Sequence, residues 1–535
     1  MGPGLNLDPV ISRLPPGNLA AAGAETTERS GLAHAAHAAD APLAARQRAA
    51  ALAALGRGEG FDLAVIGGGA TGLAIALQAA WVGRSVALVE AGDFAGGTSS
   101  RSTKLLHGGV RYLAQGRIGL VREALHERAA LIGLAPRLAR PLRFVMPAYR
   151  WWERAFYGLG LWAYDRLAGS ASLGPTRQLS GLCTRRDYPK LVTRGLRGAV
   201  SYCDAQFDDA GLALAMARGA AQAGAVIVNR VQAIGVIESG GQVCGVSVRD
   251  RETDAQITIH ARDVVNAAGV WVDALRTGAP MVEPSQGAHI VVARTFFPAD
   301  EALLLPRTAD GRVLFIVPWL DHCVIGTTDT PRSAAELPPL AEPLPFAEEI
   351  DLILAEVGRV LSPAPSRADI LSAWAGLRPL VRPAQPAAGG TGDSAGRTGS
   401  ISREHAIEVA GNGLTTITGG KWTTCLAMAR DLLRALPHGP IDIDAVTAQA
   451  LPADAPDCAA RAPTADEVRW LAEHTWARTV EDVLARRSRL LFLDVRAALA
   501  AAPAVAAALG EATGQDPDLE GFRLLASSWL ARLQP

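Results

Sequence analysis

Cysteine is scarce in this chain and follows no pairing pattern. The 535 residues include 6 cysteines, which lie far apart at Cys183, Cys203, Cys244, Cys323, Cys425 and Cys458. Because the sequence contains no CxxC pair and no ligand spacing typical of a metal site, it indicates no bound metal. We expect these cysteines to be reduced thiols in a cytoplasmic environment.

Net charge is also nearly absent. The 52 basic residues almost balance the 53 acidic ones, and the formal charge is -1. Such a chain lacks the overall basic character that is typical of nucleic-acid binding. The first residues also lack the basic region and apolar stretch of a secretory signal, so we expect none. Any cationic site must therefore be local.

Long apolar runs are rare, and the longest one, Leu63 to Gly83, has no charged residue. Its length resembles that of a membrane span. Several glycines, the polar Thr71 and Gln78, and charged residues at both edges argue against that interpretation. We interpret the run as a strand followed by a helix.

The stretch around this run has the order of a dinucleotide-binding βαβ unit. A β-branched run, Leu63 to Ile66, precedes the glycines, and a second run, Ser85 to Val89, ends at Glu90. The turn between strand and helix contains Gly67, Gly69, Ala70, Thr71 and Gly72. Glycines permit the tight turn and the close approach of a pyrophosphate, and the helix N-terminus attracts it. Glu90 is placed to bind a ribose.

A polar segment, Thr98 to Leu113, follows this unit. It combines hydroxyls with Lys104, His107, paired glycines and Arg111. If the nucleotide is FAD, small residues here would let the backbone lie against the isoalloxazine. The alternative is a solvated polar loop. The apolar neighbours of the glycines favour the closely packed backbone.

Eight motifs between Phe61 and Asp494 occur in a characteristic order. They are Phe61 to Tyr112, Phe207 to Ala225, Val264 to Asp273, Gly287 to Val292, Val317 to Asp329, Ala375 to Leu380, Gly419 to Thr424 and Val480 to Asp494. Together they resemble the FAD-dependent glycerol-3-phosphate dehydrogenases of the amino-acid-oxidase-like flavoprotein superfamily. Three positions depart from that family's pattern. Cys425 and Leu426 stand where Tyr and Arg are frequent, and Gln286 replaces a lysine.

The resemblance implies an α/β fold with three units. A Rossmann-like FAD-binding domain of the glutathione-reductase and amino-acid-oxidase type would comprise residues 60–115, 199–270 and 401–439. An inserted antiparallel-sheet substrate domain would comprise 116–198 and 271–400. A small helical domain would follow over 440–535. Residues 1–59 form an extension that we expect to be disordered at first and then helical.

The resemblance also implies FAD as the cofactor and a set of residues around it. They are Gly67, Gly69, Ala70, Thr71, Gly72, Glu90, Thr98, Ser99, Ser100, Lys104, Leu106, His107, Val231, Ala268, Gly269, Gly420, Lys421, Trp422 and Thr423. The backbone near Val231 would meet the adenine. Lys421 follows two glycines and precedes a hydroxyl-rich helix start, a combination that can place a cation near the N1/O2 edge of the flavin.

For the substrate, the resemblance implies glycerol 3-phosphate, oxidised to dihydroxyacetone phosphate by hydride transfer to FAD. Arginine suits a dianionic phosphate because its guanidinium donates charge-assisted, bidentate hydrogen bonds. The candidate substrate-binding residues are Arg111, Tyr112, Arg378, Arg403 and Thr328. The candidate catalytic residues are His107, Arg378, Lys421 and His289.

A base must take the proton of the C2 hydroxyl, and an imidazole with a pKa near neutral pH is suitable. His107 is the first candidate and His289 the second. An arginine near the hydroxyl is also possible, and the sequence leaves these alternatives open. Each histidine could instead be a hydrogen-bonded packing residue.

Tyr149 to Leu167 mixes aromatic rings with three arginines. This composition suits a helix at a membrane interface, and it also suits a buried helix whose arginines reach solvent. The resemblance implies a membrane quinone as electron acceptor and peripheral association with the inner face of the cytoplasmic membrane, and it is compatible with a homodimer. Alternatives are an oxidase that uses O2, a flavin-dependent amine oxidase, and an FAD-binding protein without catalysis.

Several local predictions remain. Thr464 with Glu467, and Thr479 with Asp482, have the spacing of capping boxes. Arg486, Arg487 and Arg489 are expected to form a solvated basic face, with a dimer or lipid contact as the alternative. The low-complexity insert at 385–400 is expected to be a flexible surface loop.

Overall fold

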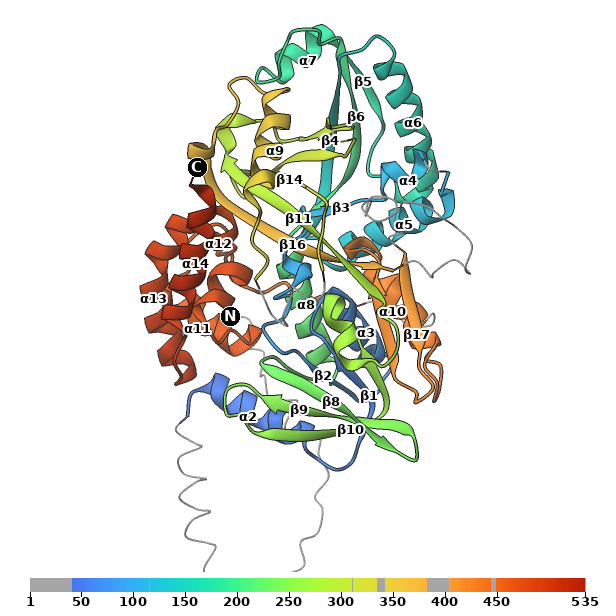
Figure 1. Cartoon of the computed structure of the whole chain (residues 1–535), viewed down its shortest axis with the longest axis vertical. Helices are drawn as coiled ribbons and strands as arrows, with labels where there is room; N and C mark the ends of the chain where they lie inside the picture. The colour runs from blue at the N-terminus through green and yellow to red at the C-terminus, as the bar shows by residue number, and fades with distance from the viewer. Residues whose placement is uncertain are drawn as a thin grey trace, which may run out of the picture.

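The computed structural model describes residues 41–114, 116–309, 311–333, 342–382, 404–443 and 449–534. Two sheets lie one above the other, and the C-terminal helices, in red, lie beside both of them (Figure 1). The expectations for residues 1–40 and for the insert at 385–400 fall outside the described residues.

The lower sheet is the nucleotide-binding unit. Its strands are β1 (Phe61–Ile66), β2 (Val86–Val89), β7 (Val226–Val228), β10 (Gln256–Asn266), β17 (His405–Val409) and β18 (Thr415–Gly419). Strands β18, β10, β1, β2 and β7 run parallel in that order, and β17 is antiparallel at the edge. This order joins segments that lie far apart in the sequence. The predicted βαβ unit is confirmed.

Both faces of the parallel sheet are covered, which explains its continuous apolar strands. Leu63 and Val65 pack with the helices α3 (Ala70–Trp81), α8 (Asp209–Gln222) and α10 (Cys425–Arg434). Ala64 and Ile66 point the other way, toward a meander of β8 (Val231–Ser239), β9 (Gln242–Asp250) and the first half of β10. Cys425 and Leu426 are buried in the helical layer, so their side chains serve packing.

The helix predicted before β1 is α2 (Leu43–Leu55), and it begins after Pro42. The helix packs on the meander through Leu55. Its Arg48 is buried and pairs with Asp250 at 2.5 Å.

The upper sheet contains the strands predicted for the inserted antiparallel sheet, together with others. Its strands are β3 (Leu105–Leu106), β4 (Ala139–Ala148), β5 (Arg177–Ser180), β6 (Gly198–Phe207), β11 (Val282–Ala293), β12 (Ala302–Leu305), β13 (Leu314–Trp319), β14 (His322–Gly326), β15 (Thr330–Pro331) and β16 (Ile370–Val381). All pairings are antiparallel except that of β12 with β4. The prediction assigned β3 and β6 to the nucleotide domain, whereas they pair here. The chain therefore enters the upper unit before residue 105 and leaves it after residue 207.

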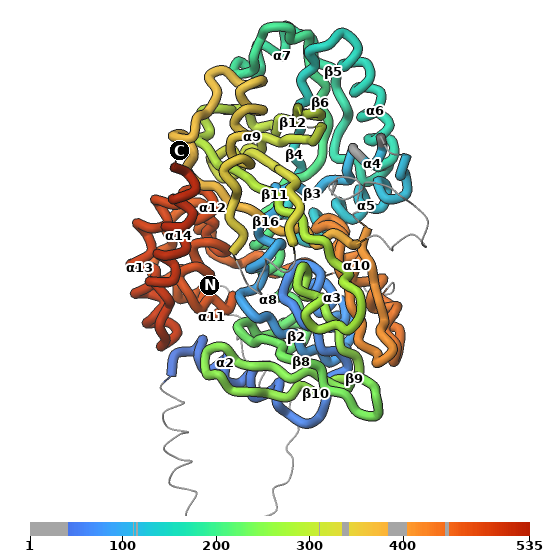
Figure 2. Tube along the Cα trace, in the orientation of Figure 1, coloured from blue at the N-terminus to red at the C-terminus, as the bar shows by residue number. Residues whose placement is uncertain are grey.

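Helices surround the upper sheet. They are α4 (Val110–Ala114), α5 (Ile118–Leu134), α6 (Glu153–Ala168), α7 (Gly181–Asp187) and α9 (Ala347–Gly358). Helix α6 runs along one outer edge of the molecule, away from the C-terminal helices, in both ribbon and tube views (Figures 1 and 2). Short 3-10 turns are η1 (Thr98–Ser100), η2 (Gly169–Ala171), η3 (Gly269–Leu275), η4 (Arg294–Phe296), η6 (Arg367–Asp369) and η8 (Trp422–Thr424).

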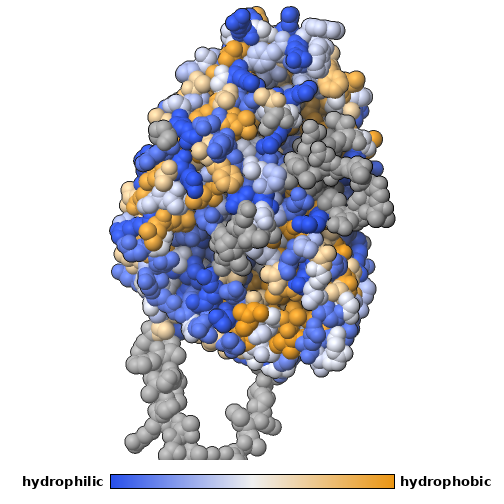
Figure 3. Space-filling view, viewed as in Figure 1, coloured by the Kyte–Doolittle hydropathy of each residue, from blue (hydrophilic) through white to orange (hydrophobic). Residues whose placement is uncertain are grey.

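The C-terminal unit is helical, as predicted. It contains α11 (Ala465–Thr475), the π-helical turn η9 (Asp482–Arg487), α12 (Leu490–Leu493), α13 (Val495–Thr513) and α14 (Leu519–Leu533). Thr464 and Glu467 form the expected capping box. By length and composition, α13 is the one described helix that could cross a membrane. Its apolar side packs in the core of this unit. Hydrophilic residues cover the lower part of the unit, beside α2 (Figure 3).

Candidate active site

The nucleotide loop lies at the carboxyl ends of the parallel strands, where α/β sheets bind ligands. Gly67 has φ +112, and a Cβ there would lie 2.6 Å from the backbone oxygen of Ala267. A Cβ on Gly72 would collide with the oxygen of Gly67. Helix α3 begins at Ala70, and its N-cap residue Gly69 makes no side-chain cap. These glycines leave space for a phosphate at the N-terminus of the helix.

Glu90 lies next to this loop. One carboxylate oxygen accepts the Gly68 N–H at 2.7 Å, and the other accepts the Gly92 N–H at 2.7 Å. Burial raises the pKa of Glu90. The N–H of Val231 donates to the Glu90 backbone oxygen at 2.8 Å, so the two residues expected at the ribose and the adenine are neighbours. Loop, helix end and carboxylate together fit a dinucleotide.

The hydroxyls after β2 tie distant segments together. Ser99 Oγ accepts the Ala70 N–H at 2.9 Å, and Thr98 Oγ1 donates to the Leu377 oxygen at 2.5 Å. Trp422 Nε1 donates to the Ser99 oxygen at 2.8 Å. The predicted residues near 98 and near 422 are therefore adjacent in space. Ala268 and Gly269 begin η3, and Thr418 Oγ1 donates to the Gly269 oxygen at 3.3 Å.

Lys104 was expected at the cofactor, and the structure gives its side chain a different place. The ammonium is fully buried, 2.8 Å from Asp209 and 2.7 Å from the oxygen of Ser100. It also lies 4.8 Å from the centre of the Trp374 ring. Burial lowers the pKa of Lys104 to about 7. The side chains of Ser100 and Leu106 are buried as well.

A cavity of about 1070 Å³ lies between the two sheets. The predicted residues that line it are Thr98, His107, Tyr112, His289, Thr328, Arg378, Gly420, Lys421, Trp422 and Thr423. It is thus lined by residues expected at both the cofactor and the substrate. Its volume is at the upper end of the range for small-molecule sites.

Arg378 points from β16 to this cavity and is held in place on one side. Its Nη2 donates to Thr327 Oγ1 and to the Thr328 oxygen, each at 3.0 Å. Its Nη1 lies 3.4 Å from Asp329. On the neighbouring strand a side chain at Gly287 would collide with the guanidinium. The glycine in the Gly287 to Val292 motif therefore makes room for this arginine.

His289 lies on β11 and is almost completely buried. Its ring stacks on Trp374 with the centroids 4.1 Å apart, and its Nε2 is 2.9 Å from Thr103 Oγ1. Its Nδ1 has no hydrogen-bond partner among the residues that the structure describes. Burial lowers the pKa of His289 well below 6.5, and the charges of Lys104 and Arg378 act in the same direction. The imidazole is therefore neutral at pH 7.

The two glycine pairs meet at the opposite wall. The His107 N–H donates to Thr423 Oγ1 at 3.2 Å, which joins the predicted HGG and GGK segments. Lys421 Nζ lies 4.0 Å from the centre of the Tyr112 ring. Gly420 has φ +72, and a Cβ there would meet Met428. The glycine thus allows Lys421 to enter the cavity wall just before α10.

Of the three arginines predicted to bind the phosphate, the structure describes only the side chain of Arg378. Arg403 lies outside the described residues, and for Arg111 only the backbone, in α4, is described. Thr328 was expected to bind substrate, but its Oγ1 donates to Glu349 at 2.7 Å and accepts the Ala288 N–H at 2.8 Å. Its hydroxyl is therefore engaged by the protein, whereas the Thr327 hydroxyl contacts Arg378, and both threonines line the cavity.

Sequence reasoning missed several other polar residues that line the cavity, among them Arg101, Arg312, Thr327 and Asp329. Arg101 forms a bidentate pair with Glu342, with both distances 2.7 Å. Thr327 and Asp329 belong to the quoted motif at Val317 to Asp329, and only their proximity to Arg378 identifies them. Among the described residues, no cluster of His, Cys, Asp and Glu could hold a metal.

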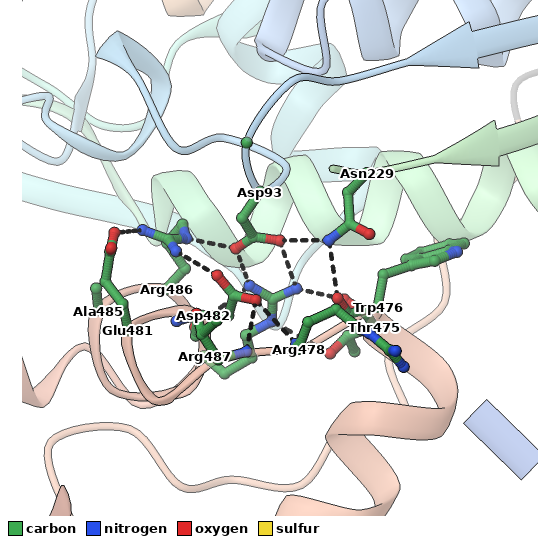
Figure 4. Close-up of polar contacts among 12 residues, drawn as sticks. Asp93, Asn229, Thr475, Trp476, Arg478, Glu481, Asp482, Ala485, Arg486 and Arg487 are labelled. Atoms are coloured by element: carbon green, nitrogen blue, oxygen red, sulfur yellow. Dashed lines mark hydrogen bonds and ion pairs between the residues drawn. The ribbon is translucent and has the colours of Figure 1, made fainter. Parts of the chain in front are cut away.

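The expected basic face of Arg486, Arg487 and Arg489 is wrong, because all three side chains are buried. Figure 4 shows Arg486 and Arg487 directed at Asp93 of the nucleotide unit. Arg489 reaches Asp209 at 2.9 Å. The acidic residues just before them, Glu481 and Asp482, were the available signal for ion pairing. These arginines join two units instead of facing solvent.

Gln286 also has a packing role. Its amide donates to Glu349 at 2.8 Å, and its oxygen accepts Arg332 at 2.5 Å. The side chain is buried away from the cavity. Substitution of the family's lysine therefore changes the strand's support and leaves the cavity wall unaltered.

Comparisons with known proteins agree with this geometry. Residues 62–426 match the family model described as FAD dependent oxidoreductase, and residues 442–519 match the C-terminal domain of alpha-glycerophosphate oxidase. The chain is 41% identical over 395 residues to the mitochondrial glycerol-3-phosphate dehydrogenase of Mus musculus, which covers 70% of this chain and 52% of the mouse protein. It is 44% identical over 402 residues to glycerol-3-phosphate dehydrogenase 2 of Mycobacterium tuberculosis, covering 74% and 66%. The chain thus spans about half to two thirds of these relatives.

Among solved structures, the glycerol-3-phosphate dehydrogenase of Bacillus halodurans complexed with FAD aligns with a TM-score of 0.69 and 26% identity. The alignment covers 92% of this chain and 99% of that one. L-alpha-glycerophosphate oxidase of Mycoplasma pneumoniae, with FAD bound, shares the fold at a TM-score of 0.54 and 16% identity. The resemblance seen in the motifs, the fold class and the FAD cofactor are confirmed. The chain belongs to the FAD dependent oxidoreductase family.

Proposed function

We propose that this enzyme oxidises sn-glycerol 3-phosphate to dihydroxyacetone phosphate and passes the electrons to a membrane quinone. The observation that carries the proposal is the cavity, which brings an oriented arginine and a neutral imidazole together with residues of the two segments at 98–113 and 419–423 that are predicted to lie at the flavin. The relatives named glycerol-3-phosphate dehydrogenase support the same substrate.

Arg378 binds the substrate phosphate in this proposal. Thr327, Thr328 and Asp329 orient one side of its guanidinium. A guanidinium has five N–H donors in a fixed plane, so an oriented one can still give charge-assisted bonds to a phosphate. Arg111 and Arg403 are proposed to complete the phosphate-binding site.

The proton of the C2 hydroxyl goes to His107. FAD, when bound, supplies the acceptor for the hydride that leaves C2. His289 is also in the cavity wall, but the low pKa of its buried ring makes it a poor base at neutral pH. We therefore keep His107 as the base and assign His289 the role of a neutral hydrogen-bonding partner for the substrate. Lys421 and the N-terminus of α10 place positive charge beside the flavin site.

Helix α6 supports a lipid-soluble acceptor. Its apolar outer residues are unusually exposed: Trp151, just before the helix, is 82% exposed, Phe156 is 65%, Leu159 is 69% and Trp162 is 52%. The same helix lines the cavity through Tyr157 and Leu161, and its exposed Phe156 and Leu159 lie at the cavity as well. An aromatic face flanked by arginines suits peripheral binding to an anionic membrane surface. A quinone from that membrane would meet an apolar wall.

Anaerobic reduction of the bound flavin by glycerol 3-phosphate tests the substrate. We expect the flavin absorbance to bleach in the wild type, and we expect Arg378→Ala to need about 10- to 100-fold more substrate, the equivalent of one lost charge-assisted interaction. Arg359→Ala, on the exposed end of α9, is the matched control and should behave as the wild type. No bleaching at millimolar substrate would refute the proposal.

Reoxidation distinguishes the acceptors. We expect the reduced enzyme to react quickly with a short-chain quinone and slowly with O2. Rapid peroxide formation with a poor quinone rate would instead identify an oxidase. Reduction by a small amine or amino acid, with none by glycerol 3-phosphate, would identify an amine oxidase.

A further inference from the structure

A buried ionic cluster joins the C-terminal helical unit to the nucleotide unit (Figure 4). We call it the Asp93 cluster, and its charged members are Asp93, Arg230, Glu481, Asp482, Arg486 and Arg487. Its members come from the loop after β2, from the turn between β7 and β8, and from η9 with the residue before it. Its three arginines face three carboxylates, so the cluster is electrically balanced.

Asp93 is the centre on the nucleotide side. One of its oxygens accepts Arg486 Nε and Arg487 Nη1, and the other accepts Arg487 Nη2 at 3.0 Å. Asn229 Nδ2 donates to Asp93 at 3.2 Å and to the Trp476 oxygen at 2.8 Å. Asp93 and Asn229 are both buried. The C-terminal unit therefore contacts both loops that follow β2 and β7.

Asp482 is the centre on the C-terminal side. It accepts the backbone N–H of Arg478 at 2.8 Å and that of Thr479 at 3.0 Å, and Thr479 Oγ1 accepts the Asp482 N–H in return. The predicted capping pair is thus present. Asp482 also pairs with Arg486 at 2.7 Å and with Arg230 at 2.9 Å. Its pKa is lowered by these arginines, which keeps the carboxylate ionised.

The two loops held by the cluster are those that fit the adenosine half of FAD. Glu90 lies three residues before Asp93, and the Arg230 N–H donates to the Gly92 oxygen at 2.8 Å. The next residue, Val231, is bonded to Glu90. Phe94 also packs under the glycine loop, since a Cβ on Gly68 would lie 2.5 Å from its ring. That ring meets Trp476 edge-on at 5.2 Å.

We propose that Arg486 and Arg487 are positioning residues for FAD, through which the C-terminal helical unit sets the affinity of the nucleotide site. Neither arginine lines the cavity. They act by fixing Asp93, and through it the backbone between Glu90 and Phe94. Removing one partner leaves a buried charge uncompensated, so the loops must rearrange to hydrate or neutralise it. The proposal concerns FAD alone and does not depend on the identity of the substrate.

The test is the dissociation of FAD from purified holoenzyme, followed by the recovery of flavin fluorescence on dilution, well below the unfolding temperature. We expect Arg487→Gln to raise the dissociation constant for FAD at least about tenfold. In enzyme saturated with FAD, the KM of the reducing substrate should be unchanged. Arg461→Gln, at an exposed ion pair with Glu467 in the same unit, is the control and should retain FAD as the wild type does.

A double-mutant cycle separates positioning from general stability. Adding Asp93→Asn to Arg487→Gln should weaken FAD binding less than the product of the two single effects, because the charges are removed together. If Arg487→Gln fails to fold, Arg230→Gln, at the partly exposed edge of the cluster, carries the test and should raise the dissociation constant about three- to tenfold. Folded variants that unfold at lower temperature but keep wild-type FAD affinity would overturn the proposal.

Discussion

Tyr164 shows how one side chain of α6 supports the candidate site. Its hydroxyl accepts the Gly108 N–H at 2.8 Å and donates to Asp204 at 2.8 Å. Asp204 in turn accepts Arg128 at 2.6 Å, and all three side chains are buried. Because Gly108 follows His107 directly, this hydroxyl fixes the segment that carries the proposed base.

Tyr164→Phe should therefore weaken both stability and turnover. It leaves the Gly108 N–H and one oxygen of Asp204 without this partner, which we expect to cost about 1 to 3 kcal/mol in the free energy of unfolding. A displaced base should lower kcat by about 10- to 100-fold. Denaturant unfolding and steady-state turnover measure the two effects. Tyr149→Phe, whose hydroxyl donates to the Val192 oxygen at 3.2 Å, is the control and should retain turnover.

His289 makes the stability of the protein depend on pH. Its pKa is lowered by burial, so below about pH 6.5 the unfolded chain binds a proton that the native state excludes. Stability should then fall as the pH drops, by up to about 1.4 kcal/mol per pH unit from this residue, and the loss should stop below the native pKa. In His289→Gln this part of the slope should disappear. Parallel stability curves for both proteins between pH 7 and 5 would contradict the assignment.

At the same scale, the sequence predicted side chains well where neighbours along the chain determine their place. Gly67, Gly72 and Glu90 lie in one local βαβ unit, and Glu90 accepts the Gly68 N–H of the glycine loop. Lys104 and Arg486 could not be placed in this way, because their partners Asp209 and Asp93 are 105 and 393 residues away. A charged residue in a motif gives no sign of whether it faces a ligand or a buried carboxylate.

Helix α6 carries the exposed apolar side chains that we propose to enter the lipid of a membrane. Each large apolar side chain that moves from water into lipid contributes about 1.5 to 3 kcal/mol. Phe156→Ser combined with Trp162→Ser should therefore reduce binding to anionic lipid vesicles by at least about tenfold, as measured by cosedimentation. Leu524→Ser, at a 73% exposed position of α14, should leave vesicle binding unchanged. Equal binding of the double variant and the wild type would remove α6 from the membrane proposal.

The positions of helices and strands along the sequence were predicted better than the sheet to which each strand belongs. The patterns gave β1, α3 and β2 correctly, because an apolar run and a glycine turn are properties of the segment itself. β6 was assigned to the nucleotide domain, although it pairs with β4 over Ala139 to Ala148. A buried apolar strand has the same appearance in either sheet, so only its partners decide its place.

The whole molecule should unfold as one unit. The core of the C-terminal helices includes Trp374 of the upper sheet, against which Phe492 packs at 5.1 Å, while the Asp93 cluster joins the same helices to the lower sheet. Phe492→Ala should cost about 3 to 5 kcal/mol. Tryptophan fluorescence, circular dichroism and flavin release should all shift together to lower temperature. Leu524→Ala is the surface control, and separate transitions for the probes would show independent units.

The position of Asp93 also has a consequence for biosynthesis. Its partner Arg487 is 394 residues further along the chain, and a ribosome adds about 5 to 20 residues each second. About 20 to 80 s therefore pass between the synthesis of Asp93 and that of the arginines that pair with it. During that time the glycine turn and β1 can already exist, whereas β10 and β18, which continue the parallel sheet beside β1, emerge later. Tight capture of FAD should therefore follow only after the residues around 487 have been synthesised.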